Sequence, residues 1–344
     1  MAAPPPLKKP ERGDWIGWAM VAVGGGSAPS AINLAIESAP PAVIAAFRIW
    51  AAAVLLLVYT YATGRRLVMP TSPAGLELWL YAAAAGFVGY AMPFFLFPYA
   101  QLQVSSIMAG IVMAFLPVMA VVFAALFAGE PMTKRSLGGV LVGSLGVLFL
   151  LGPAVFGGIS GTALGILLLL LAVLGYAVMG VIMRRAPDHP ARSFATMMML
   201  AAAVMATPFA VGAELEGISA ASWSAILFLG LVPTGINAIV IVTVVRRAGA
   251  GFLATSAYAS PVIAVFFGIS FFGEPLAATQ ILGLLTILAG VALTQSGGHK
   301  TAPASSQAGI TAAEEKTPGG PNSKEQAAPH GQHGLPPKDH PAIR

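Results

Sequence analysis

The hydrophobic positions of this chain fall into long continuous runs with short polar breaks between them. A helix needs about 20 apolar residues to cross a hydrocarbon core of about 30 Å, and ten runs of that length recur here. They lie near residues 15–36, 41–63, 76–98, 104–128, 136–155, 161–183, 194–213, 222–245, 251–272 and 277–295. The pattern predicts an all-α membrane protein with ten transmembrane helices.

Two boundaries in this pattern are less clear than the others. Only residues 99–106 separate the third run from the fourth. The first run follows a basic segment, an arrangement that also fits a secretory signal peptide, but its apolar part is longer than the roughly 7–15 residues of a signal-peptide core. We therefore expect the first run to remain in the protein as a transmembrane helix.

The charged residues give an independent indication of orientation. Lys and Arg accumulate in short cytoplasmic loops, and with ten runs and a cytoplasmic N-terminus every basic loop of this chain lies inside. The basic residues of the N-terminal tail and loops are Lys8, Lys9, Arg12, Arg65, Arg66, Lys134, Arg135, Arg184, Arg185, Arg192, Arg246 and Arg247. The alternate loops carry only acids, such as Glu37 and Glu274. Both termini are therefore predicted to be cytoplasmic.

Composition agrees with a membrane protein. The 344 residues are 57% hydrophobic and 9% charged, whereas soluble domains carry about 25% charge. The 39 Gly and 27 Pro fit helices that pack closely or bend in lipid. The lipid bilayer is thus an expected partner. Nucleic acid is not expected, because the basic residues form short pairs rather than one basic surface.

The residue types also limit the chemistry. The sequence has no Cys, its five His residues lie in a loop or the tail, and neither a Gly-x-Ser-x-Gly nor a His-Glu-x-x-His motif occurs. A membrane enzyme would need a nucleophile with a base, or metal ligands, at membrane depth. We therefore expect no catalytic residues, no metal site and no cofactor. Since no run has an acid or His near its middle, proton coupling through such a group is not expected.

The two ends of the chain differ from its middle. Residues 1–13 form a short basic N-tail, and residues 296–344 are rich in Pro, Gly, Ser, Lys and Glu. Such composition offers too little apolar surface to offset chain entropy. We expect 296–344 to be a disordered cytoplasmic tail, in which His330, His333 and His340 are solvated rather than metal ligands.

An internal repeat divides the hydrophobic region. A constant shift of 144 residues lays 86–147 over 230–291 without a gap. The matched pairs include Gly86 with Gly230, Pro117 with Pro261, Phe123 with Phe267, and Gly129-Glu130-Pro131 with Gly273-Glu274-Pro275. Shared hydrophobicity alone does not produce such a match. The sequence predicts two repeats, 14–155 and 156–295, with five spans each.

Because five is odd, the second repeat enters the membrane in the opposite orientation to the first. Inverted repeats are typical of secondary transporters, in which two near-equivalent halves expose a central site to each side in turn. The repeat therefore favours a transporter with a small-molecule substrate. The alternative is a duplicated membrane protein that acts as a sensor or scaffold without transport. The sequence is also compatible with a homodimer.

These features together resemble a known family. Ten spans in two inverted halves, Pro in the fourth and ninth runs followed by Gly-Glu-Pro, and Pro41 with Arg48 in the second run are similar to the EamA-type members of the drug/metabolite transporter superfamily. The resemblance covers about residues 14–295. The second half departs from it, since its seventh run offers only Arg192, at the cytoplasmic edge, where Arg48 would recur.

The resemblance implies a multi-pass carrier of the bacterial inner membrane with a central cavity between the two halves. Such carriers often export amino acids or related metabolites. Drug efflux, nucleotide-sugar traffic and cofactor uptake are the alternative activities within the superfamily.

Arg48 is the first candidate for the substrate site. It is the one Lys or Arg inside an apolar run, and an intramembrane charge is costly enough to suggest a function. It lies roughly 12 Å from the outer end of its helix, at 1.5 Å per residue. It could bind a substrate carboxylate or helix-end carbonyls in the cavity. Alternatively, it could snorkel outward or hold neighbouring helices together.

Neutral polar residues supply further candidates for the cavity. Each needs a hydrogen-bonding partner away from water, and the Tyr rings suit partly apolar substrates. Ser30 and Asn33 are three residues apart and so share a helix face. The set comprises Ser30, Asn33, Tyr90, Tyr176, Asn237, Ser256 and Tyr258. For each residue alone, packing or interhelical bonding is the alternative role.

Paired Pro and Glu residues complete the predicted set. Pro117 and Pro261 lie inside apolar runs, where Pro removes a backbone hydrogen bond and bends the helix, so both are candidate hinges or static kinks. Glu130 and Glu274 stand at the ends of runs beside Pro. Because an acid favours a helix N-terminus, we expect both Glu residues to mark helix boundaries.

Overall fold

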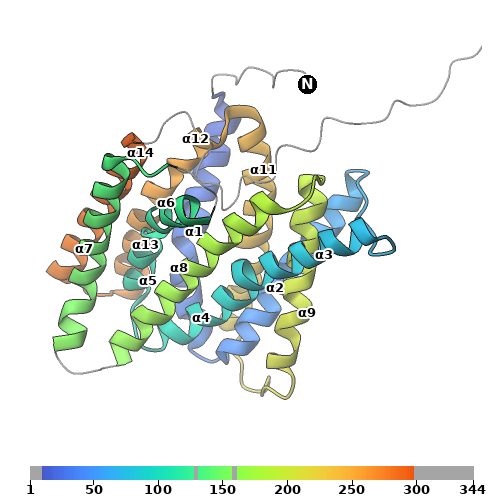
Figure 1. The fold of residues 1–344 in the computed structure, drawn as a ribbon. Helices are drawn as coiled ribbons and strands as arrows, with labels where there is room; N and C mark the ends of the chain where they lie inside the picture. The colour runs from blue at the N-terminus through green and yellow to red at the C-terminus, as the bar shows by residue number, and fades with distance from the viewer. Residues whose placement is uncertain (1–9, 128–130, 157–160, 298–344) are drawn as a thin grey trace, which may run out of the picture. The chain divides into compact units, whose positions relative to one another are not determined.

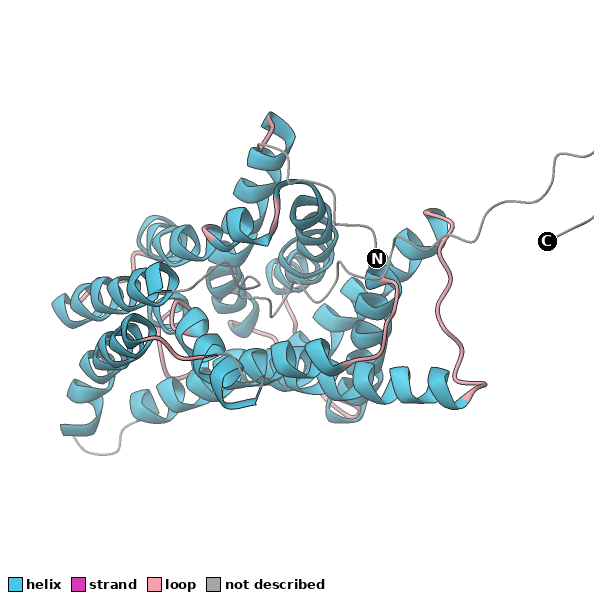
Figure 2. Cartoon of the chain, turned by 45° about the horizontal axis from the view of Figure 1, so that its top comes forward, coloured by secondary structure: helices cyan, strands magenta, loops and turns pink. Residues whose placement is uncertain are grey.

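The structure is a computed structural model that describes residues 10–127, 131–156 and 161–297. Every regular element in these ranges is helical, as Figure 2 shows. Within these described ranges, ten spans are long and apolar enough to cross a membrane, which confirms the sequence prediction. They cover Arg12–Ile36, Pro41–Ala62, Pro73–Gln101, Ser106–Phe127, Lys134–Gly152, Gly161–Arg185, Ala191–Ala210, Ala220–Val245, Gly251–Phe272 and Ala278–Gln295.

Six of these spans are single helices, and the other four are built from shorter pieces (Figure 1). The single helices are α1 (Arg12–Ile36), α2 (Pro41–Ala62), α7 (Lys134–Phe156), α8 (Gly161–Arg185), α9 (Ala191–Ala210) and α14 (Ala278–Gly297). The third span comprises α3 (Pro73–Gly86), η1 (Phe87–Ala91) and α4 (Met92–Gln101), and the fourth comprises α5 (Ser106–Met113) and α6 (Leu116–Phe127). The eighth comprises α10 (Ala220–Leu229), η2 (Gly230–Ile236) and α11 (Asn237–Ala248), and the ninth comprises α12 (Ala250–Ala254) and α13 (Ser256–Phe272).

The break between the third and fourth spans, which hydropathy left poorly defined, has a local chemical cause. Ser105 is the residue before α5, and its hydroxyl accepts a hydrogen bond from the Met108 backbone N–H at 3.2 Å. A Ser in this position satisfies one of the N–H groups that a helix start leaves without a partner. The Ser105 hydroxyl is thus one of the groups that cap the start of the fourth span.

The repeat is visible in the backbone as well as in the sequence. The elements η1 and η2 are π-helical turns, and the shift of 144 residues lays η1 onto residues 231–235 of η2. π-Helical turns are rare and occur frequently at functional sites. The third and eighth spans thus share a backbone irregularity that hydropathy does not reveal.

The two repeats interleave rather than form separate bundles. Helix α1 of the first repeat packs mainly on α10, α11 and α13 of the second, and α8 of the second repeat packs mainly on α3, α4, α5 and α6 of the first. Helices α7 and α14 pack against each other at the left edge of Figure 1. A Cβ added to Gly139 would lie 2.6 Å from the Gly290 carbonyl oxygen, so these two helices touch backbone to backbone.

Some predicted features lie outside the described residues. These are Glu130, residues 1–9 of the N-tail and residues 298–344 of the C-terminal tail. Helix α14 continues to Gly297, beyond the predicted end of its run at 295.

Candidate substrate cavity

A cavity of about 270 Å³ lies between the spans of the two repeats. Its described lining comes from eight spans, all except the fifth and tenth. Ligand pockets typically measure roughly 300–1,000 Å³, so this volume suits a small metabolite. Apolar side chains and a few polar ones surround it, the latter being Arg48, Tyr90, Tyr176, Thr234, Asn237, Ser256 and Ser260. No Asp or Glu occurs among these described lining residues.

Arg48 on α2 is the charged group of the described cavity lining, and only 6% of its surface is exposed. Its Nε donates a hydrogen bond to the Thr234 hydroxyl at 3.0 Å. Its guanidinium carbon lies 3.7 Å from the centre of the Phe94 ring, a cation–π contact. Among the described residues, Arg48 forms no ion pair and no further hydrogen bond. The two groups that contact its guanidinium, Thr234 and Phe94, are both neutral. Its positive charge therefore remains free to pair with a negatively charged group of a ligand.

An aromatic and sulfur-rich wall lines the cavity and, through Phe94, borders Arg48. The Tyr90 and Phe94 rings meet edge to face at 5.8 Å between centroids, and Phe97 and Tyr176 add two more rings to the lining. Four methionines complete the wall: Met113, Met179, Met183 and Met198. Thioethers are polarizable and adapt to irregular apolar shapes. The wall therefore suits an apolar portion of a ligand.

Helices α1, α11 and α13 supply neutral hydrogen-bonding groups. The Asn237 side-chain amide lies 3.5 Å from the Val21 carbonyl oxygen, and Ser260 donates to the Ser256 carbonyl at 3.1 Å. A Cβ at Gly25 would lie 3.2 Å from the Ser260 hydroxyl, so α1 approaches α13 closely there. These groups present amide and hydroxyl oxygens without negative charge.

Both predicted hinge prolines line the cavity. Pro261 lies inside α13, but Pro117 lies in the first turn of α6, just after the break between α5 and α6. Pro is well tolerated at the start of a helix. The two matched prolines therefore sit in different local backbones.

Three predicted cavity residues do not line this cavity. Ser30 and Tyr258 each follow a lining residue by one position, but neither belongs to the lining. The Ser30 hydroxyl lies 3.5 Å from that of Ser106, and Tyr258 packs against the apolar core. Asn33 lies further along α1 and donates to Glu274 at 3.5 Å.

Glu274 caps a helix, but not the one that follows it. Its carboxylate accepts hydrogen bonds from the backbone N–H groups of Ser106 and Ile107, each at 2.9 Å. These residues begin α5, so the acid meets the positive end of that helix. The side chain connects the α13–α14 loop of the second repeat to α5 and, through Asn33, to α1 of the first.

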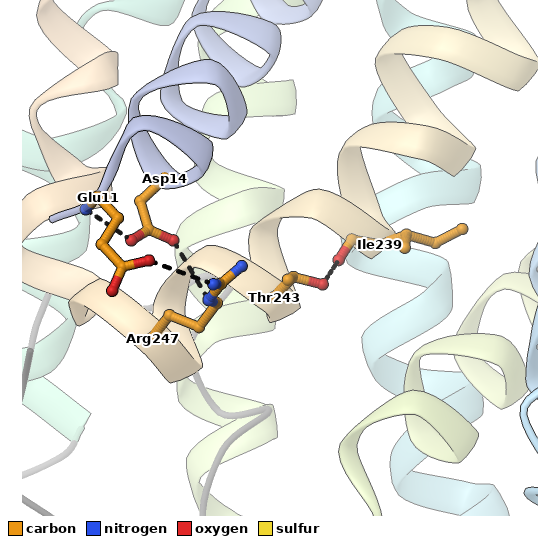
Figure 3. A network of polar contacts seen from close by, with 5 residues as sticks. All are labelled: Glu11, Asp14, Ile239, Thr243 and Arg247. Atoms are coloured by element: carbon orange, nitrogen blue, oxygen red, sulfur yellow. Dashed lines mark hydrogen bonds and ion pairs between the residues drawn. The ribbon is translucent and has the colours of Figure 1, made fainter.

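A second contact joins the repeats at the other end of α1. Figure 3 shows Glu11 and Asp14, at the start of α1, facing Arg247 on α11. Arg247 Nε lies 3.7 Å from Asp14 Oδ1, and its Nη2 lies 3.7 Å from Glu11 Oε2. Asp14 is 4% exposed and also accepts from the Glu11 backbone N–H at 3.0 Å. The residues 14 and 33 are roughly 28 Å apart along α1 at 1.5 Å per residue, with the cavity-lining part of the helix between them.

Sequence reasoning missed Thr234, Phe94 and Asp14. Thr234 could have been found, since the shift of 144 pairs it with the candidate Tyr90. Phe94 carried no such signal, because an aromatic residue in an apolar run is ordinary. Asp14 directly precedes the first apolar run and so escaped a search restricted to the middle of the runs. No group of three or more described His, Cys, Asp or Glu side chains could hold a metal ion.

Known proteins resemble this chain along most of its length. It is 29% identical over 280 residues to the uncharacterized inner membrane transporter YedA of Escherichia coli K12, covering 80% of this chain and 88% of that protein. It is 26% identical over 272 residues to the uncharacterized transporter YdfC of Bacillus subtilis, covering 78% and 86%. One crystal structure of 19% identity shares the fold, with a TM-score of 0.59 over 82% of this chain and 98% of its own.

The family comparison agrees with the two repeats. The pattern of the EamA-like transporter family matches twice, at residues 14–152 and 163–295. These stretches hold all the described residues that line the cavity. Ten spans, two repeats and a central cavity thus coincide with the family match, and the chain belongs to the EamA-like transporter family.

Proposed function

We propose that this protein exports amino acids or related small carboxylates across the bacterial inner membrane by alternating access. Membership of the EamA-like transporter family supports membrane transport as its general function. The Escherichia coli relative is named an inner membrane transporter, which supports the same membrane for this chain. Arg48, a cation buried in the central cavity without an acidic partner among the described residues, carries the proposal for the substrate.

A substrate carboxylate would supply the negatively charged partner that Arg48 lacks among the described residues. Removing a charge from water costs several kcal/mol unless it is paired and hydrogen-bonded. The Nε group of Arg48 is already used by Thr234, which leaves the two terminal nitrogens as donors. A carboxylate can accept two parallel hydrogen bonds from a guanidinium. A substrate that carries a carboxylate therefore gains more from this cavity than one that lacks it.

The rest of the lining favours an amino acid with an apolar side chain. An ammonium group needs acceptors, and the oxygens of Asn237, Ser256 and Ser260 offer neutral ones. An apolar side chain finds the wall of aromatic and Met residues. With Arg48 present and no acid in the described lining, a cationic drug would meet uncompensated repulsion. The Met-rich wall alone would also suit a lipophilic drug, which keeps drug efflux as the second candidate.

Alternating access is supported by the contacts at the two ends of α1. Glu274 links the second repeat to α1 and α5 at one end, and Arg247 links it to α1 at the other. The cavity-lining residues of α1 lie between these links. Breaking one link while keeping the other would open the cavity to one side of the membrane, as two inverted repeats rocking about a central site require.

The proposal is tested by flux into vesicles that contain the purified protein. A panel of labelled amino acids, nucleosides and cationic drugs would be compared in the wild type, Arg48→Ala and Arg192→Ala. Arg192 is the matched control, because its guanidinium carbon lies 5.4 Å from the Tyr59 ring centre and it does not line the cavity. Saturable amino-acid flux that only Arg48→Ala abolishes supports the proposal. Flux of cationic drugs alone would favour efflux, and no flux in folded protein would favour a sensor or scaffold.

A further inference from the structure

We propose that Thr234 is a positioning residue, which the π-helical turn η2 places so that it aims the Arg48 guanidinium into the cavity. This inference rests on the proposed role of Arg48 as the carboxylate site. It adds a residue on the eighth span that sets the affinity for the carboxylate without touching it.

Two consecutive hydrogen bonds fix the orientation of the Thr234 hydroxyl. Its hydrogen is donated to the Leu229 carbonyl at 2.7 Å, so a lone pair is left to accept from Arg48 Nε at 3.0 Å. Thr234 and Arg48 are 5% and 6% exposed. In such a buried site an unpaired polar group is costly, so this arrangement is strongly preferred over a free rotation of either side chain.

The π-helical turn places Thr234 opposite the Leu229 carbonyl. In a regular α-helix this carbonyl would accept from the backbone N–H four residues later, but residue 233 is proline and has no N–H. The backbone at residues 230–236 is π-helical, and in a π-helix the matching residue is five positions later, which is Thr234. The Thr234 hydroxyl donates to the same Leu229 carbonyl. The irregular turn thus aligns Thr234 with an acceptor that anchors its side chain.

Gly230 brings this turn close enough to α2 for the contact to form. A Cβ on Gly230 would lie 2.7 Å from the Arg48 carbonyl oxygen and 2.6 Å from the Ala51 Cβ. Both distances are too short for any residue but glycine. The backbone that carries Thr234 therefore rests directly on the backbone that carries Arg48.

The aromatic contact fixes the remaining freedom of Arg48. The Phe94 ring lies against the guanidinium at 3.7 Å, while Thr234 holds its Nε. The terminal nitrogens are then the part of the group left for the cavity. Since a bidentate contact with a carboxylate depends on the direction of these nitrogens, the hydroxyl of Thr234 should govern carboxylate affinity.

The first test compares hydroxyl removal with hydroxyl retention. Thr234→Val keeps the shape and removes the hydroxyl, and Thr234→Ser keeps the hydroxyl. Thr243→Val is the matched control, because Thr243 on the same span also donates to a backbone carbonyl, that of Ile239 at 2.9 Å, and is exposed. The probes are L-leucine and L-leucinamide, which lacks the carboxylate, measured as half-saturation concentration and maximal flux in proteoliposomes at about pH 9, where the leucinamide amine is largely uncharged.

We expect Thr234→Val to raise the half-saturation concentration for leucine about tenfold, with little change in maximal flux or in leucinamide transport. Thr234→Ser and Thr243→Val should behave like the wild type. In an Arg48→Ala background, Thr234→Val should have no further effect, as for two residues acting through one interaction. Equal losses for leucine and leucinamide, or equal behaviour of Thr234→Val and Thr243→Val, would overturn the inference.

A second readout needs no transported substrate. In the wild type the Arg48 Nε–H is hydrogen-bonded and buried, so its NMR signal, assigned with Arg48→Lys, should exchange slowly with solvent. Thr234→Val should speed this exchange and Thr234→Ser should restore it. Unchanged exchange in Thr234→Val would reject Thr234 as the positioning residue even if Arg48 binds the carboxylate. Loss of the role of Arg48 itself would show separately, as flux that Arg48→Ala does not alter.

Discussion

The π-helical turns η1 and η2 are the same backbone feature in two repeats, yet they carry different side chains. Position for position, Tyr90 on η1 corresponds to Thr234 on η2. Both residues line the cavity. The aromatic residue contributes to the apolar wall, whereas the hydroxyl of Thr234 holds Arg48. The duplicated backbone was retained while the chemistry of the two halves diverged.

The same divergence separates α2 from α9. Pro40 precedes α2 and Pro190 precedes α9, so a shift of 150 residues pairs Arg48 with Met198. The packing supports this pairing. Gly230 rests on the backbone carbonyl of Arg48, and its repeat counterpart Gly86 rests on that of Met198. The equivalent positions thus keep their backbone contact, but one carries a charge and the other a thioether.

The largest effect should come from removing the charged member of this pair. Arg48→Ala should lower amino-acid flux by about 30-fold or more, since hydrogen bonds to a charged group are worth about 1.5–3 kcal/mol each. Met198→Ala, at the equivalent position, should change it by less than about fivefold. Flux in vesicles, with protein folding checked by thermal melting, measures both. Similar losses of flux in the two variants would contradict the claim that the first repeat carries the charged substrate-binding residue and the second does not.

Adding a methyl group to the paired glycines should have a smaller and partly shared effect. Gly86→Ala and Gly230→Ala should each destabilise the protein by about 1–3 kcal/mol, because overpacking forces backbones apart. Only Gly230→Ala should also weaken amino-acid binding, since it displaces Arg48. Unfolding in denaturant and binding calorimetry separate the two effects. Equal loss of binding in both variants would contradict the account.

The Glu274 contact should contribute about 1 kcal/mol, the typical value of a helix cap. Glu274→Gln keeps the size of the side chain but weakens its two bonds to the start of α5. Glu214→Gln, an exposed acid in the loop between α9 and α10, is the control. We expect lower stability in denaturant only for Glu274→Gln. Identical curves for the two variants would show that the link between repeats is weak.

The smallest effect should appear in the turns that precede α2 and α9. Shifted by 150 residues, Ala39 corresponds to His189, whose ring packs on Phe194 at 4.0 Å between centroids. Burial lowers the pKa of His189, although its contact with the Pro187 carbonyl and the nearby Asp188 oppose this. Its Nε2 is buried without a partner among the described residues. The folded state therefore prefers the neutral ring.

The sign of the pH dependence follows from this preference. With the folded pKa below the unfolded one, near 6.5, stability is greatest above pH 6.5 and falls as the pH drops through the folded pKa. His189→Gln should flatten this decline. The difference between wild-type and variant melting curves, measured from pH 8 to about pH 5, isolates His189 because both proteins carry the same tail His residues. A decline that persists unchanged in the variant would refute the assignment.

The spans, the repeats and several cavity residues were predictable because they follow from hydropathy, residue type and a constant shift. Arg48 stood out as a charge in an apolar run, and Tyr90, Tyr176, Asn237 and Ser256 as polar groups there. The structure places these five in the cavity lining. What they do there depends on their partners, and that part remains a proposal.

Other features depended on contacts that no local pattern encodes. To predict that the side chains of Ser30 and Tyr258 do not line the cavity, one must know how each helix is rotated about its axis. That rotation is set by packing between helices. The partners of Glu274 are 167 and 168 residues away in the sequence. The π-helical turns leave no trace in hydropathy, and the contact of Phe94 with Arg48 depends on the relative position of two spans.

The central claim is that Arg48 binds the carboxylate of the substrate. Its most direct test is equilibrium binding of L-leucine and L-leucinamide to the purified wild type, Arg48→Ala and the Arg192→Ala control, measured by calorimetry at about pH 9, where the leucinamide amine is largely uncharged. The account predicts that the wild type and Arg192→Ala prefer leucine over leucinamide by at least about tenfold, and that Arg48→Ala loses this preference. A preference that survives unchanged in folded Arg48→Ala would contradict the claim.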